Sequence, residues 1–151
     1  MQRRIRNSAK ALIIKDGKVL LSKLDDNGDV FFIMPGGGQD VGEVLTDTVK
    51  RECMEELGIE VDPKFLVFIL EGANGEENHR IDFVFLCNYI RDIKDIEIQG
   101  DTHQVGAEWV SIDNIMNEPL YPYKYRNAIL KLYKNENFDI YLGNENKGDF
   151  D

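Results

Sequence analysis

Histidine, tryptophan and cysteine are scarce in this chain of 151 residues, which contains two histidines, one tryptophan and two cysteines. Cys53 and Cys87 are far apart and form no Cys-x-x-Cys pattern, so we expect two reduced thiols in a core rather than a disulfide. His79 and His103 are isolated and are more typical of loop residues than of metal ligands. The sequence therefore argues against a zinc enzyme and against a disulfide-rich scaffold.

Long apolar runs are also missing. The longest, Phe65–Leu70, is far shorter than the roughly 20 residues that a helix needs to cross a bilayer. The basic N-terminus, with Arg3, Arg4 and Arg6, is followed only by the short run Ala11–Ile14, which is not typical of a secretory signal. We therefore expect a cytoplasmic protein with no membrane partner.

The chain also has fewer basic than acidic residues, 18 compared with 28, and its net charge is −10. Such a surface repels the backbone of nucleic acids, so no polymeric nucleic-acid partner is expected. A small phosphorylated ligand is still compatible, because a bound cation can reverse the sign of the charge locally. The length and the 42% apolar content predict one domain over residues 1–151, with a sizeable core.

Apolar runs separated by turn signals predict a mixed sheet. Asp16-Gly17 is typical of a tight hairpin turn between two such runs. A polar loop is expected over Leu24–Asp29, and Pro35–Gly38 is expected to end regular structure. The strands predicted on this basis are Ala9–Lys15, Lys18–Lys23, Val30–Met34, Phe65–Glu71, Ile81–Tyr89 and Ala107–Ser111. The pair Phe65–Glu71 and Ile81–Tyr89 is apolar at successive positions, which is typical of strands covered on both faces.

Two helices are predicted, over Val44–Leu57 and Lys124–Lys134. The first has apolar residues at every fourth position, namely Leu45, Val49, Cys53 and Leu57. Gly58 follows where a left-handed C-terminal cap belongs. The tail after the second helix is polar, and its last residues, about 143–151, are expected to be disordered. Hairpin strands combined with helices indicate an α/β sandwich rather than a doubly wound parallel fold.

Three carboxylates, Glu52, Glu55 and Glu56, fall within an arc of roughly 100° on the first helix, beside its apolar stripe. Glu52 and Glu56 repel each other across one turn, and Glu55 and Glu56 lie in the last turn, where the helix dipole disfavours anions. The simplest interpretation is a solvated acidic face, with Arg51 spaced for a salt bridge to Glu55. The alternative is a cation site, and oxygen ligands of this kind select Mg²⁺, with Mn²⁺ as a substitute.

The segment Gly37–Ile59 resembles the Nudix box, Gly-x5-Glu-x7-Arg-Glu-U-x-Glu-Glu-x-Gly-U, in which U is a bulky aliphatic residue. The invariant positions are all matched, by Gly37, Glu43, Arg51, Glu52, Glu55, Glu56 and Gly58. Cys53 stands at the first U position, where we interpret it as a small core residue. Less specifically, Phe32–Gly37 resembles the family's entry to the box, and Glu108-Trp109-Val110 resembles a late strand of the family.

The resemblance implies the Nudix α/β/α sandwich and a Mg²⁺-dependent attack of water on a nucleoside diphosphate linked to another group, with a nucleoside triphosphate as the favoured substrate. It implies that Glu52 and Glu56 are the principal metal ligands and that Glu55 is a ligand or a base. It also implies supporting roles, with glutamates oriented by Arg51, a close loop approach at Gly37 and Gly38, and a loop brace at Glu43.

Other assignments stay open. Outside the box, Glu97, Asp101 and Glu108 are candidates for the general base, with His103 a weaker one. The candidates for contacting the substrate are Phe32, Arg80, Phe85 and Tyr121. ADP-ribose and dinucleoside polyphosphates are alternative substrates, although the segment Lys64–Arg80 has neither the proline nor the tyrosine that marks those subgroups. A catalytically silent nucleotide sensor and an interaction protein with a solvated acidic helix are alternative functions, and a homodimer is left open.

Overall fold

The computed structural model describes residues 2–75, 77–93 and 104–145. Its strands are β1 (Arg4–Lys15), β2 (Lys18–Asp26), β3 (Asp29–Ile33), β4 (Gly36–Gly38), β5 (Ile59–Gly72), β6 (Asn78–Asp92), β7 (Gln104–Ser111) and β8 (Tyr141–Asn144). Its helices are α1 (Leu45–Leu57), the 3₁₀ helix η1 (Ile112–Asn117) and α2 (Lys124–Tyr133). The strands form a mixed sheet in the order β3-β2-β1-β6-β5-β8, with β4 added beside β1 and β7 beside β2. Within the described residues, no helix is long and apolar enough to cross a membrane.

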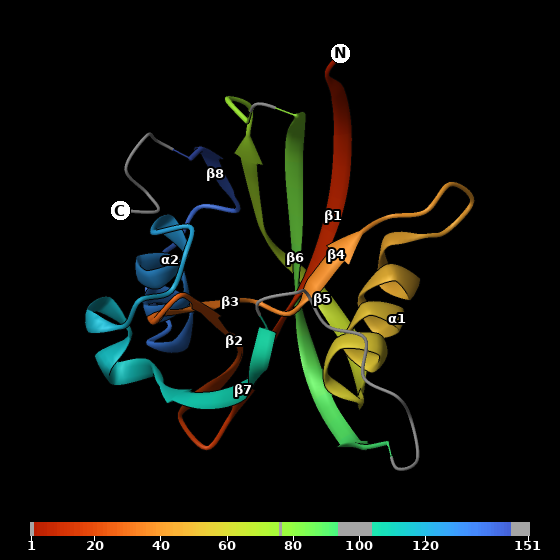
Figure 1. The fold of residues 1–151 in the computed structure, drawn as a ribbon. Coiled ribbons are helices and arrows are strands. Elements are labelled where there is room, and N and C mark those ends of the chain that lie inside the picture. Colours follow the sequence, from red (N-terminus) through yellow and green to blue (C-terminus); the bar gives the residue numbers. More distant parts are fainter. Residues whose placement is uncertain (1, 76, 94–103, 146–151) are drawn as a thin grey trace.

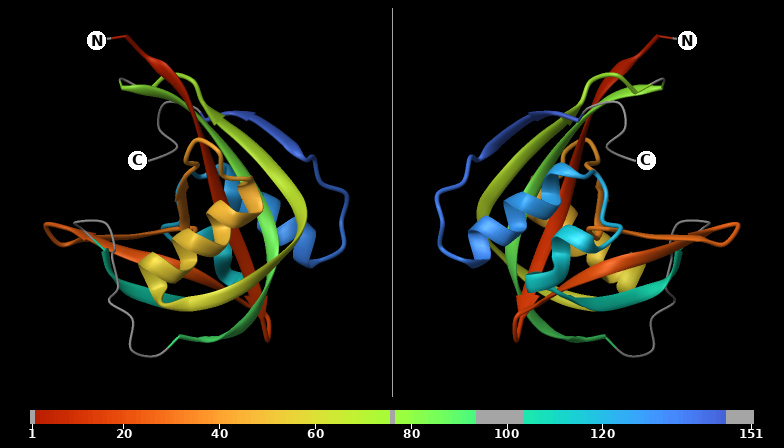
Figure 2. Two further views of the ribbon diagram at one scale, coloured as in Figure 1. Left: turned by 90° about the vertical axis from the view of Figure 1, so that its right-hand side faces the viewer. Right: turned by 90° about the vertical axis from the view of Figure 1, so that its left-hand side faces the viewer.

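Helices cover both faces of the sheet, because side chains alternate along the central strand β1. Leu12 packs in one buried cluster with Ile115 of η1 and Ile129 of α2. Its neighbour Ile13 packs on the opposite face, in a second cluster with Val49 of α1. Figures 1 and 2 show α1 on one side of β1 and β6, with α2 and η1 on the other. The predicted α/β/α sandwich is therefore confirmed.

The central strands combine two kinds of pairing. β5 and β6 form the predicted antiparallel pair, whereas β1 and β6 run parallel in continuous register from Arg4 opposite Asn78. The expectation that the β5 strand is covered on both faces is wrong at Phe65, whose side chain is 66% exposed. The register shifts between Pro63 and Phe65, because proline has no N–H for the ladder and is accommodated at such an irregularity.

Tight turns connect the first three strands. Asp16-Gly17 forms the predicted hairpin turn between β1 and β2. The prediction of a loop over Leu24–Asp29 is wrong, because β2 and β3 continue through this segment and leave only Asn27 and Gly28 between them. Both of these residues have positive φ, 54° and 94°, as a type I′ turn requires. The sequence analysis did not recognise Asn27-Gly28 as a hairpin turn, because the whole segment is polar.

The glycine segment after β3 also differs from the prediction. Gly36–Gly38 does not end regular structure but forms β4, which pairs antiparallel with β1, Gly37 lying opposite Ala9. The approach of the two backbones is close, since a Cβ at Gly36 would lie 2.1 Å from the carbonyl oxygen of Ala9. Only glycine fits there, so the residues that look like a strand breaker are those that make this pairing possible.

The C-terminal segment contains a strand that the sequence did not indicate. β8 pairs in parallel with the edge of β5, and the expectation of disorder from residue 143 onward is wrong for Gly143 and Asn144. Lys124 of α2 supports β8 by donating hydrogen bonds to the carbonyls of Leu142 at 3.1 Å and Asn144 at 2.7 Å. Residues 146–151 lie outside the described residues.

The helix predictions are confirmed within one residue at each end. α1 begins at Leu45 and is followed by Gly58 in the left-handed conformation, with φ 63° and ψ 36°. The N–H of Gly58 donates to the carbonyl of Met54 at 3.0 Å, which completes the predicted cap. Cys53 and Cys87 are both buried and unpaired, as expected of core thiols. These features hold α1 against the sheet and so determine where its glutamates lie.

Candidate active site

Arg51 connects the loop before α1 to the acidic face of the helix. Its guanidinium donates to Glu43 through Nε at 2.8 Å and through Nη2 at 3.0 Å. Its Nη1 donates to Glu52 at 2.9 Å and to Glu55 at 3.2 Å, and Nη2 also donates to the carbonyl of Gly38 at 2.9 Å. One side chain therefore orients two of the three helix glutamates and holds β4 beside them.

Glu43 stabilises the loop before α1 by accepting several hydrogen bonds. Besides Arg51, it accepts a hydrogen bond from the Thr48 hydroxyl at 2.7 Å and one from the Asp40 N–H at 3.2 Å. The Arg51 and Thr48 hydrogen bonds lower the pKa of Glu43 to about 2, so it is ionised under all ordinary conditions. Its partners account for its charge, and Glu43 is a structural residue of the loop.

Glu52 lies directly against the backbone of β4. A Cβ built on Gly37 would lie 2.5 Å from Cδ of Glu52 and 2.7 Å from each of its carboxylate oxygens. Such distances are well inside the roughly 3.5–4.0 Å of ordinary carbon contacts. Gly37 is therefore required because its missing side chain leaves the space that the Glu52 carboxylate occupies.

Glu56 is a largely buried carboxylate in the last turn of α1. Burial raises its pKa to about 7, and the neighbouring Glu52 carboxylate adds to the rise, whereas Lys10 and a hydrogen bond from the Gly36 N–H oppose it. That N–H donates to Oε2 of Glu56 at 3.3 Å. Lys10 of β1 crosses β4 at the same point, since a Cβ on Gly36 would lie 2.9 Å from Cδ of Lys10.

Glu52 and Glu56 together fit a hard divalent cation. Two neighbouring carboxylates, one of them costly to ionise, are the donor set whose repulsion a cation relieves. No group of three or more acidic, histidine or cysteine side chains already converges on one point in the described part of the chain, and Glu55 is directed to Arg51 instead. The protein would therefore supply a partial shell, which suits Mg²⁺ because this ion usually keeps waters and adds substrate phosphates.

The other predicted site residues lie elsewhere. Glu108, on β7, forms an ion pair with Lys23 at 3.4 Å and not with the helix glutamates. Phe32 is only 5% exposed and packs in the core beneath α2, so its ring does not face the surface of the site. Arg80 forms ion pairs with Asp82 and Glu145, and Phe85 packs toward α1. Glu97, Asp101 and His103 lie outside the described residues.

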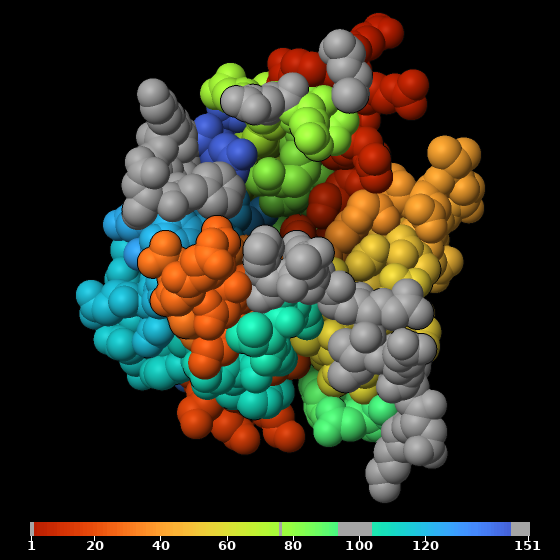
Figure 3. Space-filling view, in the orientation of Figure 1, coloured from red at the N-terminus to blue at the C-terminus, as the bar shows by residue number. Residues whose placement is uncertain are grey.

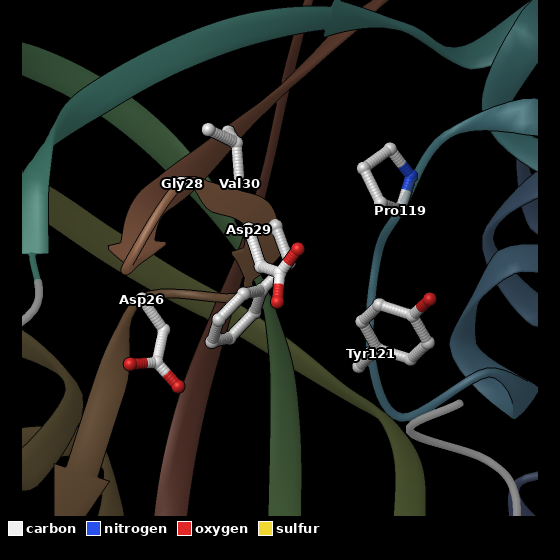
Figure 4. A pocket seen from close by; sticks show the side chains of 7 residues that line it. Asp26, Gly28, Asp29, Val30, Pro119 and Tyr121 are labelled. Atoms are coloured by element: carbon white, nitrogen blue, oxygen red, sulfur yellow. The ribbon is translucent and has the colours of Figure 1, made fainter.

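A pocket of about 520 Å³ lies between the β2–β3 turn and the segment that leads into α2. Figure 4 shows Pro119 and Tyr121 on one side, across from Asp26 and Asp29. Its aromatic lining comes from Tyr121 and from Phe31, whose ring is edge-on to it at 6.3 Å. The sequence analysis proposed the neighbouring Phe32 for contact with the substrate, because the alternation of side chains along β3 does not show which face of the strand is buried.

A smaller pocket of about 180 Å³ lies between this pocket and the acidic site. Tyr121 borders both pockets, and the smaller one is also lined by Lys10 and Arg80. The acidic helix lies across β4 from this smaller pocket, because Lys10 is opposite Gly36 in the β1–β4 pair and the N–H of Gly36 donates to Glu56. Neither Lys10 nor Phe31 was singled out by the sequence analysis, and Arg4 and Arg6 precede the predicted strand Ala9–Lys15, whereas β1 begins at Arg4.

The sequence from residue 4 to residue 132 matches the NUDIX domain family. The chain belongs to the Nudix family. It is 29% identical over 106 residues to an ADP-ribose pyrophosphatase from Methanocaldococcus jannaschii, covering 69% of this chain and 60% of that protein. It is 30% identical over 119 residues to an RNA pyrophosphohydrolase from a Wolbachia of Brugia malayi, covering 70% of this chain and 73% of that one. The chain thus spans 60% of the length of the Methanocaldococcus jannaschii relative.

The Nudix fold is also found among solved structures. A NUDIX hydrolase from Nitrosomonas europaea superimposes with a TM-score of 0.72, covering 89% of this chain and 93% of that chain, at 23% identity. Identity at that level supports the fold and leaves the substrate undetermined. Nudix hydrolases generally use divalent metal ions, which agrees with the fit of Glu52 and Glu56 to such an ion.

Proposed function

We propose that this Nudix protein is a Mg²⁺-dependent pyrophosphohydrolase of nucleotides, with a nucleoside triphosphate as its favoured substrate. The observation that carries the proposal is the pair of carboxylates of Glu52 and Glu56 against the glycine backbone of β4, where Arg51 holds Glu52 and the Gly36 N–H holds Glu56. A solvated acidic face would not need this packing, and a pure nucleotide sensor would not need to keep a buried, repelling pair.

The residues divide the chemical tasks among them. When bound, Mg²⁺ would neutralise the diphosphate oxygens and position the attacking water. Glu52 and Glu56 would hold the ion, and Lys10, which is opposite Gly36 of β4, would pair with the diphosphate. Glu55, whose side chain is 37% exposed compared with 15% for Glu52, is accessible to solvent and accepts the proton of the attacking water. The oxygen of that water bonds to one phosphorus, while the bridging oxygen leaves with the other phosphate.

The nucleoside end fits the aromatic pocket. Phe31 and Tyr121 offer rings against which a base can pack, and the carboxylates of Asp26 and Asp29 can accept hydrogen bonds from its amino and imino groups. The same carboxylates repel phosphates, which favours binding with the phosphate chain toward Lys10 and the acidic helix. The smaller pocket beside Tyr121 then holds the ribose.

A panel of nucleotides tests the proposal directly. Nucleoside triphosphates, ADP-ribose, dinucleoside polyphosphates and a 5′-triphosphorylated oligonucleotide are incubated with Mg²⁺ or with EDTA, and the products are separated by ion-exchange chromatography. We expect metal-dependent release of nucleoside monophosphate and pyrophosphate from a triphosphate. A Glu56→Gln variant should lose this turnover, and Glu60→Gln, a glutamate just beyond α1 paired with Arg91, should keep it. Absence of metal-dependent turnover across the panel would refute the hydrolase.

A further inference from the structure

Four cationic side chains lie on one face of the β1–β6 pair. We call this the β1–β6 basic face, and it consists of Arg4, Arg6, Lys10 and Arg80. In the parallel register Arg6 is directly opposite Arg80, and residues two apart on a strand point to the same side. The same alternation continues into Leu12, which packs in the cluster beneath α2. The basic face is therefore the α2 side of the sheet, where the pocket lined by Lys10 and Arg80 lies.

Among the described residues, Arg80 alone of these four cations forms an ion pair. Arg80 is held by Asp82 at 2.8 Å and by Glu145 at 2.9 Å. Arg4 and Arg6 are exposed, and neither forms an ion pair within 4.0 Å with any residue in the described part of the chain. This is unexpected in a protein with 28 acidic and only 18 basic residues, because carboxylates are in excess. The two guanidinium groups are therefore available to an anion from solution.

The glycines of β4 bring the basic face to the acidic site. Lys10 crosses Gly36, and Arg6 lies over Gly38, where a Cβ would be 2.9 Å from Nη2 of Arg6. On the other face of the same strand, Gly37 makes room for Glu52. A strand of three glycines thus has the carboxylates that fit the metal on one face and two cations on the other.

The part of β1 that carries Arg4 and Arg6 is exposed. In Figure 3 the upper parts of β1 (red) and β6 (green) stand at the top of the molecule, above the β2–β3 turn (orange). The Cα atoms of Lys10 and Arg6 are four residues apart on an extended strand, or roughly 13 Å. Neighbouring phosphates are much closer together than this, but the long side chains of lysine and arginine can converge on one phosphate chain, with the scissile bond near Lys10 and the terminal phosphate toward Arg6.

We propose that Arg6, with Arg4 behind it, binds an anionic group of the substrate beyond the scissile diphosphate, and that it selects nucleoside polyphosphates over nucleoside diphosphates linked to a neutral sugar. The inference rests on the proposed hydrolase function. A terminal phosphate can form charge-assisted hydrogen bonds with the Arg6 guanidinium, whereas a hexose offers no charge to pair with it. The acidic pocket beside Tyr121 disfavours phosphates, so the distal anion lies on the Arg6 side of the scissile bond.

Kinetics on matched substrates test the selectivity. The value of kcat/KM is measured for a nucleoside triphosphate and for the corresponding nucleoside diphosphate hexose, at constant ionic strength, in the wild type and in Arg6→Gln. The variant should lower kcat/KM for the triphosphate about 10- to 100-fold, the size of one lost charged hydrogen bond, and leave the sugar nucleotide nearly unchanged. Arg91→Gln, which removes an exposed arginine from the other end of β6, controls for net charge and should affect neither substrate. An equal loss on both substrates, or no loss, would overturn the proposal.

A binding experiment gives an answer that does not depend on turnover. Inorganic tripolyphosphate is titrated into the protein by calorimetry in EDTA, so that no metal bridges it to the glutamates. The wild type and Arg91→Gln should bind it, while Arg6→Gln and Arg4→Gln should bind more weakly, with unchanged melting temperatures. Equal binding by all four proteins would overturn the inference even if the hydrolase is active. Weakened binding in a protein that hydrolyses nothing would refute the proposed function alone.

Discussion

Replacing Gly37 by alanine tests whether the position of Glu52 limits catalysis. The backbone of Gly37 does not adopt the left-handed conformation, so alanine adds no backbone strain there. Its Cβ would lie 2.5 Å from Cδ of Glu52, against an ordinary contact of roughly 3.5–4.0 Å. The carboxylate must therefore move by about 1 Å or more, away from the position in which we expect it to hold the metal.

The expected effect falls on kcat far more than on stability. A displacement of about 1 Å in a catalytic group costs on the order of 100-fold in rate, so kcat should drop by at least that factor. The hydrogen bond from Arg51 to Glu52 is also lost, but ion pairs near the surface contribute only about 0–1 kcal/mol. The melting temperature should accordingly change by no more than about 5 °C.

Gly38→Ala is the matched control on the adjacent residue. A Cβ there meets only Nη2 of Arg6, at 2.9 Å, which is the end of a flexible side chain on the opposite face of β4. Thermal unfolding with and without Mg²⁺, together with nucleotide turnover, is measured for both variants. The Mg²⁺ stabilisation should disappear in Gly37→Ala and persist in Gly38→Ala. If Gly37→Ala keeps both wild-type turnover and the wild-type Mg²⁺ response, the close packing of Glu52 is not what positions the metal.

Three further changes separate the site from the core. Glu56→Gln should raise the metal-free melting temperature slightly, because it removes a repelling buried carboxylate. It should also abolish the stabilisation of about 2.7 kcal/mol that Mg²⁺ at 100 times its dissociation constant is expected to give. An unchanged melting-temperature response in a Mg²⁺ titration would show that the ion binds elsewhere. Cys53→Val should leave turnover intact, because Cys53 is fully buried and makes only core contacts; inactivity of the folded variant would show a chemical role for the thiol. Tyr125→Phe should lower the free energy of unfolding by about 1.5–3 kcal/mol in urea denaturation, because it removes a hydrogen bond to a charged acceptor. That bond joins its hydroxyl to buried Asp82 at 2.9 Å, and an unchanged midpoint would contradict its contribution.

The chemistry of the helix was predictable because it is local. Residues three and four apart share a helix face, so the sequence alone places Glu52, Glu55 and Glu56 together and puts Cys53 in the core. Gly58 was predictable for the same reason, since a left-handed cap depends only on the residue that follows the last turn. The box therefore indicated the family, the carboxylates that we propose as metal ligands and the arginine that orients two of the glutamates before any tertiary contact was known.

The strands β4 and β8 were not predicted, because both are held in the sheet by backbone pairing and not by an apolar side-chain pattern. β4 consists of glycines and β8 lies in a polar tail, so neither has the apolar alternation by which strands are detected. Each forms because a neighbouring strand offers free N–H and C=O groups at an edge of the sheet. Backbone hydrogen bonds carry no side-chain signature, and only the assembled sheet shows where such an edge lies.

The Nudix family, the layered α/β fold and the placement of the glutamates on α1 depend on local spacing, so they could be predicted from the residues alone. Which face each strand presents follows only from tertiary packing. It placed Phe31 rather than Phe32 at the pocket, and it set Arg6 beside Arg80 through the parallel pairing of β1 with β6. That pairing joins segments far apart in the chain, and its register is selected by the packing of both cores at once. Shifting it by one residue would turn Leu12 and Ile13 to the wrong faces, so only the complete fold specifies it.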